Sequence, residues 1–259
     1  MIPLPRLMVA PNGARLGPKD HPKLPVTLPQ IIDTARDCFA AGADGLHLHL
    51  RDTEGKHILD TGLYREALAQ LTATLPNMSV QITTESNGLY QPPHQRKIAL
   101  SSGARLVSVS VREMASDTTD ETLADFYAQC VAAGIAVQHI LYDVSDFSLL
   151  RRVLPETLFH KPELQLIFVL GRYSESNEGS PSNLDPFLRY MQAHALKPDW
   201  AVCAFGAGET ACLRYAHELG GKCRVGFENS MFREDGAIAQ DNAQRVSDIA
   251  ATIALRQIA

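Results

Sequence analysis

Several features are scarce in this 259-residue sequence, and each absence excludes a class of protein. The five cysteines are scattered and form no CxxC pair, so neither a disulfide framework nor a zinc ribbon is indicated. No apolar run approaches the roughly 18 residues that span a membrane, so no membrane partner is expected. No basic block is present and the net charge is −5, which disfavours nucleic-acid binding. The amino terminus lacks the regions typical of a signal peptide, so we expect a cytoplasmic protein.

The dominant pattern in the sequence is an alternation of two kinds of segment. Short apolar segments, expected to be β-strands, alternate with longer segments of helical period. The strands are expected at residues 6–12, 45–51, 79–84, 106–112, 136–142, 164–171, 200–205 and 222–228. The helices are expected to begin near Leu28, Thr61, Pro93, Thr119, Ser145, Asn183, Glu209 and Asn242.

Eight strand–helix units in one chain of this length are typical of a (β/α)8 TIM barrel. We therefore predict an α/β fold of this type, with residues 1–259 forming a single catalytic domain. The structural alternative is a doubly wound open sheet. That architecture usually has fewer strands and a glycine-rich first turn, which this sequence lacks.

The period of two along a strand predicts which side chains face the barrel interior. The more apolar side of each strand should pack against the helices, which leaves a polar set facing inward. This set comprises His47, His49, Arg51, Gln81, Thr83, Glu85, Ser108, Ser110, Arg112, Arg224 and Glu228. Buried polar groups are costly unless they are paired, and active sites of this fold lie at the C-terminal ends of the strands. The pattern therefore predicts an active site at that end.

His47 and His49 are the most specific local signal. Two imidazoles at positions i and i+2 share one face of a strand and can reach one metal ion, although two hydrogen-bonded core histidines are the alternative. Glu228 ends the eighth strand, which contributes to the same barrel layer as the second. Two histidines and one carboxylate with an open position are typical of catalytic zinc, and iron(II) accepts the same ligands.

Other polar residues at the strand ends are candidates for catalysis or substrate binding. Arg224 either forms an internal salt bridge or stabilises a developing negative charge. Glu85 and Glu113 are candidate bases, and we favour Glu85 because the alternation turns it inward and Glu113 outward. Thr83 and Asn12 are candidates to hydrogen-bond a substrate.

Acidic residues are expected to outnumber cations on one side of the barrel mouth. Glu85, Glu113 and Asp143 should lie there, with Arg112 as the nearby cation. Unpaired buried carboxylates favour a substrate tail that carries an amino, ammonium or hydroxyl group. The alternative is that Arg112 and Arg51 pair with these acids and leave an apolar pocket.

Two further residues and one turn are expected to be structural. A lone strand histidine such as His139 is usually a hydrogen-bonded core residue, and Cys203 lies within a strand without a fixed base partner. Gly206 and Gly208 follow the seventh strand, where they are expected to form a plain turn rather than a phosphate site.

Motifs that run nearly from end to end resemble the β-keto acid cleavage enzyme family. They include Asn12-Gly13-Ala14, His47-Leu48-His49-Leu50-Arg51-Asp52, Gln81-Ile82-Thr83-Thr84 and Arg224-Val225-Gly226-Phe227-Glu228-Asn229. The second and the last of these are specific as a pair. The resemblance implies a zinc-dependent (β/α)8 enzyme that condenses a β-keto acid with acetyl-CoA to give acetoacetate and a new acyl-CoA.

The resemblance also implies roles for individual residues. The family's zinc ligands correspond to His47, His49 and Glu228, and its essential arginine corresponds to Arg224. Thr83 keeps the hydroxyl of a serine that seats the substrate carboxylate. A homo-oligomer, a tetramer in the family, is implied as well.

Three residues depart from the family pattern. Asn229 replaces an acidic residue, Arg15 replaces the glutamate of the aminohexanoate-cleaving member, and Ala207 replaces a common arginine. An amide cannot act as a base, so another carboxylate must take that role, and Glu85 stands where the aminohexanoate-cleaving member has glycine. Two alternatives follow: an aldolase or hydrolase that does not use CoA, or a metal-binding protein that has lost catalysis.

Overall fold

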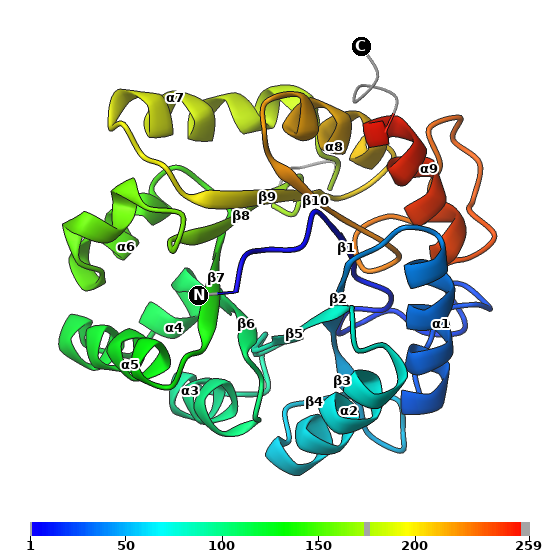
Figure 1. Cartoon of the computed structure of the whole chain (residues 1–259), viewed down its shortest axis with the longest axis horizontal. Coiled ribbons are helices and arrows are strands. Elements are labelled where there is room, and N and C mark those ends of the chain that lie inside the picture. Colours follow the sequence, from blue (N-terminus) through cyan, green and yellow to red (C-terminus); the bar gives the residue numbers. More distant parts are fainter. Residues whose placement is uncertain (1, 174–176, 255–259) are drawn as a thin grey trace.

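Eight parallel strands close into a barrel, which confirms the predicted (β/α)8 TIM fold (Figure 1). The structure is a computed structural model that describes residues 2–173 and 177–254. Around the ring the strands follow the order β1-β10-β9-β8-β7-β6-β5-β2. Their bounds are β1 (Leu7–Val9), β2 (Gly45–Leu48), β5 (Ser79–Thr83), β6 (Leu106–Ser110), β7 (Ala136–Leu141), β8 (Gln165–Leu170), β9 (Asp199–Ala204) and β10 (Lys222–Val225).

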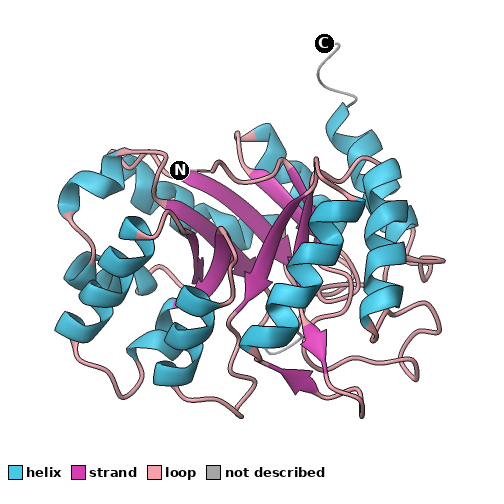
Figure 2. Cartoon of the chain, turned by 60° about the horizontal axis from the view of Figure 1, so that its bottom comes forward, coloured by secondary structure: helices cyan, strands magenta, loops and turns pink. Residues whose placement is uncertain are grey.

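The helices surround this ring, as Figures 1 and 2 show. They are α1 (Leu28–Ala40), α2 (Thr61–Thr74), α3 (Pro92–Ser101), α4 (Val111–Ala115), α5 (Asp120–Ala132), α6 (Asp146–Val153), α7 (Asp185–Ala193), α8 (Glu209–Glu218) and α9 (Asn242–Ala254), with 3₁₀ helices η1 (Glu156–His160) and η2 (Pro181–Leu184). Side-chain caps explain several starts: the side chains of Thr27, Asp60 and Thr119 each accept a backbone N–H of the first turn. In the part of the chain that the structure describes, no helix is long and apolar enough to cross a membrane.

All eight barrel strands end one to three residues earlier than the sequence predicts, and three of these early ends reshape the active-site end. The second strand stops at Leu48, and β3 (Leu50–Arg51) pairs antiparallel with β4 (His57–Ile58). The fourth stops at Ser110, whose side chain accepts the N–H of Glu113 and starts the short helix α4. The eighth stops at Val225, because Gly226 turns the chain with φ +137°.

Two apolar clusters hold the barrel together. The larger lies between the strands and the helices and contains the residues predicted to face outward, such as Leu46, Val107 and Val225. The smaller fills the interior and contains Met8 and Ile167. Burial of these apolar side chains drives the strands and helices together. The polar inward-facing residues lie at the C-terminal ends of the strands.

The chain segment before β1 closes the N-terminal end of the barrel. It crosses the ring in Figure 1. Leu4 belongs to the interior cluster, and the Gln165 side-chain amide donates a hydrogen bond to the carbonyl of Ile2. Access to the interior is therefore left to the C-terminal end, where the predicted site lies.

Candidate active site

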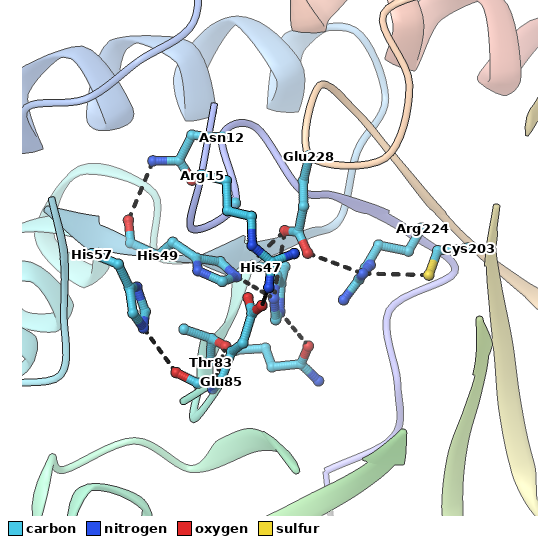
Figure 3. Close-up of polar contacts among 12 residues, drawn as sticks. Asn12, Arg15, His47, His49, His57, Thr83, Glu85, Cys203, Arg224 and Glu228 are labelled. Atoms are coloured by element: carbon cyan, nitrogen blue, oxygen red, sulfur yellow. Dashed lines mark hydrogen bonds and ion pairs between the residues drawn. The ribbon is translucent and has the colours of Figure 1, made fainter. Parts of the chain in front are cut away.

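The imidazoles of His47 and His49 and the carboxylate of Glu228 meet at the C-terminal end of the barrel (Figure 3). The two Nε2 atoms lie 3.1 Å apart. Glu228 Oε2 lies 3.7 Å from His47 Nε2 and 3.5 Å from His49 Nε2. The structure thus brings together the three residues that sequence reasoning selected as metal ligands.

The spacing of these three atoms fits a metal ion. Ligands about 2.0–2.1 Å from a tetrahedral zinc ion lie about 3.3 Å from one another, close to the observed separations. Burial lowers the pKa of His47 to about 4 and the pKa of His49 well below its usual value, so both rings are neutral at pH 7. Glu228 Oε2 is buried and accepts no hydrogen bond from the described residues. An ion-sized gap between neutral imidazoles and an unpartnered carboxylate oxygen suits a divalent cation.

A cavity of about 220 Å³ opens beside the three residues. Its size suits a small molecule rather than a polymer. Besides the three ligand candidates it is lined by Asn12, Gly13, Ala14, Arg15, Leu16, Thr83, Glu85, Ser110, Glu113, Ile140, Tyr142, Val169, Arg172, Phe205, Arg224 and Asn229. These residues come mainly from the loops that follow the barrel strands.

Arg224 lies on β10 and is buried against the carboxylate of Glu228. Its Nη2 donates to Glu228 Oε1 at 3.2 Å and to Cys203 Sγ at 3.3 Å (Figure 3). Its Nε is buried without a partner among the described residues. The internal salt bridge considered from the sequence is therefore present, and Arg224 also lines the cavity beside it.

Glu85 lines the same cavity and is held through its backbone and its side chain. Its N–H donates to Thr83 Oγ1, and its carbonyl accepts from His57 Nε2. Its carboxylate lies 3.3 Å from Arg15 Nη2. Burial and the nearby charge of Glu228 raise the pKa of Glu85 to about 7. A carboxyl with that pKa exchanges its proton at neutral pH, as a general base must.

Comparison with known families decides the assignment. The model of the beta-keto acid cleavage enzyme family matches residues 6–258. The chain belongs to the beta-keto acid cleavage enzyme family. The membership predicted from the motifs is confirmed, and with it the prediction that the chain is an enzyme.

Relatives in this family are distant but cover most of the chain. The 3-oxoadipate:acetyl-CoA acetyltransferase of Cupriavidus necator is 23% identical over 258 residues, which are 95% of this chain and 87% of the relative. The 3-keto-5-aminohexanoate cleavage enzyme of Fusobacterium nucleatum is 23% identical, with 92% and 86% covered. The structure of ObcA in ternary complex with a C4-CoA adduct and oxalate superposes with a TM-score of 0.70 at 16% identity, covering 91% of this chain and 65% of ObcA. At that identity the superposition shows the fold alone.

Two of the residues predicted to bind substrate lie at the site. Thr83 and Asn12 are buried and line the cavity, together with Asn229. Asn12 Nδ2 donates to the carbonyls of Pro25 and His49, so Asn12 ties the first loop to the metal candidates. Both amide atoms of Asn229 are without partners among the described residues, which leaves them available to a bound molecule.

The fourth strand corrects two predictions. Because α4 replaces the end of this strand, Glu113 turns into the cavity and Arg112 turns away from it. Glu113 Oε2 accepts from the Ser86 N–H at 2.8 Å and from Gln95 Nε2 at 2.7 Å. Arg112 is exposed and pairs with Asp146 at 2.6 Å, so its predicted inward orientation is wrong.

The predicted surplus of unpaired acids is also wrong. Asp143 is exposed and lines a neighbouring cavity together with Arg112. Glu85 has Arg15 as its partner, and Arg172 brings a further cation to the site cavity. The argument for a cationic or hydroxylated substrate tail therefore loses its basis. Arg15 and Arg172 lie in loops, which strand periodicity does not place.

The predicted structural residues lie outside the cavity. Cys203 is fully buried, and Gly206 forms a turn with φ +79°. His139 is a core residue whose ring lies edge-on to that of Tyr127, with the ring centroids 4.9 Å apart, but its Nδ1 has no hydrogen-bond partner among the described residues.

Arg51 is not the inward-facing residue of the second strand that the alternation predicted. Its guanidinium donates to the carbonyls of Gly13, Leu16 and Gly55 and so anchors the first loop.

Proposed function

We propose that this chain is a zinc-dependent enzyme that condenses a β-keto acid with acetyl-CoA to give acetoacetate and a new acyl-CoA. The observation that carries this proposal is the group of His47, His49 and Glu228 beside a small polar cavity. The names of the two relatives support the substrate classes, because each names a 3-keto acid and one names acetyl-CoA.

The proposed reaction exchanges acyl groups and needs no oxidant or reductant. The bond between the keto carbon and the neighbouring methylene carbon of the β-keto acid breaks. The methylene carbon, which keeps its carboxylate, becomes bonded to the acetyl carbon while the acetyl–sulfur bond of acetyl-CoA breaks. The sulfur released in this way takes the acyl group of the keto acid, and the methylene carbon leaves as part of acetoacetate. The methylene carbon releases a proton before it forms its new bond and takes one back when its old bond breaks, so the reaction requires a base that returns the proton.

The residues that line the cavity supply the groups that this reaction needs. Zinc held by His47, His49 and Glu228 would act as a Lewis acid on the substrate oxygens. Glu85, a carboxylate whose pKa is raised by burial in the metal-free protein, accepts the proton from the methylene carbon. The guanidinium of Arg224 stabilises the negative charge that grows as the carbon–carbon bond forms or breaks. The hydroxyl of Thr83 hydrogen-bonds the substrate carboxylate.

An assay with matched reactants separates this proposal from the alternatives. The zinc-loaded protein is incubated with a panel of β-keto acids, each with and without acetyl-CoA, and acetoacetate is measured. Acetoacetate that forms only with acetyl-CoA supports the proposal. Turnover of a keto acid without acetyl-CoA would instead indicate an aldolase or hydrolase. Binding without turnover for every keto acid would indicate a protein that has lost catalysis.

A further inference from the structure

Two buried glutamines form a row of hydrogen bonds that ends at a proposed metal ligand. His47 Nδ1 lies 2.7 Å from Gln81 Oε1. Gln81 Nε2 donates to Gln138 Oε1 at 2.9 Å, and Gln138 Nε2 donates to the carbonyl of Leu166 at 3.3 Å. The row joins β2, β5, β7 and β8. Since β6 lies between β5 and β7 in the ring, the bond between the two glutamines crosses the barrel interior.

The far end of this row sets the direction of every hydrogen bond in it. The carbonyl of Leu166 can only accept, so Gln138 must turn its NH₂ toward Leu166 and its oxygen toward Gln81. Gln81 must then donate to Gln138 and turn its own oxygen toward the imidazole. An amide oxygen accepts only, so His47 must carry its proton on Nδ1. Its Nε2 is therefore left with a lone pair that faces Glu228.

We infer that Gln81 and Gln138 are positioning residues that hold His47 in the Nδ1–H tautomer and thereby aim its Nε2 lone pair at the metal. Neither glutamine lines the cavity, so both act through the imidazole and not on the substrate. The inference rests on the metal site of the proposed function. Mutation of a residue that hydrogen-bonds the second ring nitrogen of a histidine ligand typically lowers metal affinity by about 10- to 100-fold.

His49 is coupled to His47 in the metal-free protein. Its Nδ1 is buried without a hydrogen-bond partner among the described residues, and its Nε2 lies 3.1 Å from His47 Nε2. One of these two Nε2 atoms must donate across that distance, so a His47 protonated on Nδ1 accepts from the Nε2–H of His49. A change at Gln81 that moves the proton of His47 to Nε2 should therefore move the proton of His49 to Nδ1.

The first measurement is the tautomer of His47 in the metal-free protein at pH 7, read from the ¹⁵N shifts of its ring. We expect the Nδ1–H form in the wild type and a loss of that preference in Gln81→Met, which removes the acceptor with little change in volume. The His49 ring, whose Nε2 lies 3.1 Å from His47 Nε2, should shift in the opposite sense, from its Nε2–H toward its Nδ1–H form. A wild-type His47 protonated on Nε2, or a Gln81→Met protein that keeps the Nδ1–H form, would overturn the inference.

The second measurement is zinc affinity, from competition with a chromophoric chelator. Gln81→Met should weaken binding by about 10- to 100-fold. Gln165→Met is the matched control, because it removes another buried glutamine that donates to the Ile2 carbonyl and does not contact the three ligand candidates. It should change affinity by less than about twofold, and an equal loss in both variants would refute the positioning role. If Gln81→Met does not fold, Gln138→Met serves in its place: a smaller loss of affinity supports the inference, and wild-type affinity contradicts it.

Failure of this inference is distinguishable from failure of the proposed reaction. A protein that binds zinc through the Nδ1–H form of His47 but makes no acetoacetate would refute the reaction and leave the positioning role intact. A protein that makes acetoacetate although Gln81→Met binds zinc normally would do the reverse.

Discussion

Replacing Glu85 by glutamine should stabilise the metal-free protein at pH 8. Burial and the charge of Glu228 raise the pKa of Glu85 from its ordinary value of 4.5 to about 7. The folded state therefore favours the protonated carboxyl, and ionising it opposes folding. The stability that the neutral carboxyl allows is fully present below pH 4.5 and is lost as the pH rises through about 7. Glutamine resembles the neutral form at every pH.

The magnitude follows from the two pKa values. Each pKa unit corresponds to about 1.4 kcal/mol, so the ionised Glu85 lowers the free energy of unfolding by about 3 kcal/mol at pH 8 and by less than about 1 kcal/mol at pH 5. The pKa of about 7 already includes the attraction of Arg15, whose side chain is half exposed, so the loss of this ion pair is not subtracted again. The net gain at pH 8 should therefore be about 3 kcal/mol. This corresponds to a rise in Tm of roughly 6–12 °C for a chain of this size.

Thermal unfolding of chelator-treated protein at pH 8 and at pH 5 tests this reasoning. The difference between Glu85→Gln and the wild type should be positive at pH 8 and small at pH 5. Glu113→Gln is the control: it replaces a carboxylate in the same cavity that accepts hydrogen bonds from Ser86 and Gln95, so it should lower Tm. A Glu85→Gln protein with an unchanged or lower Tm at pH 8 would refute the argument.

The same pair of variants tests the choice of base in the zinc-loaded enzyme. Glu85→Gln should collapse turnover and abolish the acidic limb of the pH–rate profile. That limb should lie below pH 7 in the wild type, because a bound divalent cation lowers the pKa of a nearby carboxyl. If Glu85→Gln retains wild-type turnover and Glu113→Gln loses it, Glu113 is the base.

Three further predictions concern the ligands, the arginine and the first loop. Metal analysis should find about one divalent ion per wild-type chain and almost none in His47→Ala/His49→Ala; full occupancy in that double variant would exclude the proposed ligands. Arg224→Lys should lower kcat by about 100-fold or more with nearly unchanged metal content, because lysine lacks the planar fork, whereas a normal kcat would leave Arg224 a structural ion pair. Gly13→Ala should weaken zinc binding by about tenfold or more in the chelator competition, because Gly13 has φ +59° and an added Cβ would lie 2.6 Å from the Glu228 side chain. Gly17→Ala is the control and should bind zinc as the wild type does, because the space around Gly17 is open.

Most of the fold could be predicted from local sequence patterns. The eight strands and the helix starts were predictable because strand and helix periods depend on residues close together in the chain. Leu46, Val107 and Val225 pack outward as the alternation requires. His47 and His49 were found as a pair because neighbouring alternate residues share a strand face, whatever the rest of the chain does.

The limits of the strands and the partners of the charged groups were decided only by tertiary structure. The short helix α4 turns Arg112 outward and Glu113 inward. A strand that continued to Arg112, as the sequence predicts, would give both side chains the opposite orientation. Arg15 and Arg172 reach the cavity from loops, whose course depends on what they pack against.

The sequence by itself determined the barrel, the outward aliphatic faces and the candidate ligands, because each depends on a repeat that can be counted along the chain. Tertiary structure alone decided the raised pKa of Glu85 and the row that joins His47 to Gln81 and Gln138. The pKa depends on exclusion of water by distant segments. The row depends on β5 and β7 facing each other across the closed barrel. No local sequence pattern specifies that these two strands come close in space.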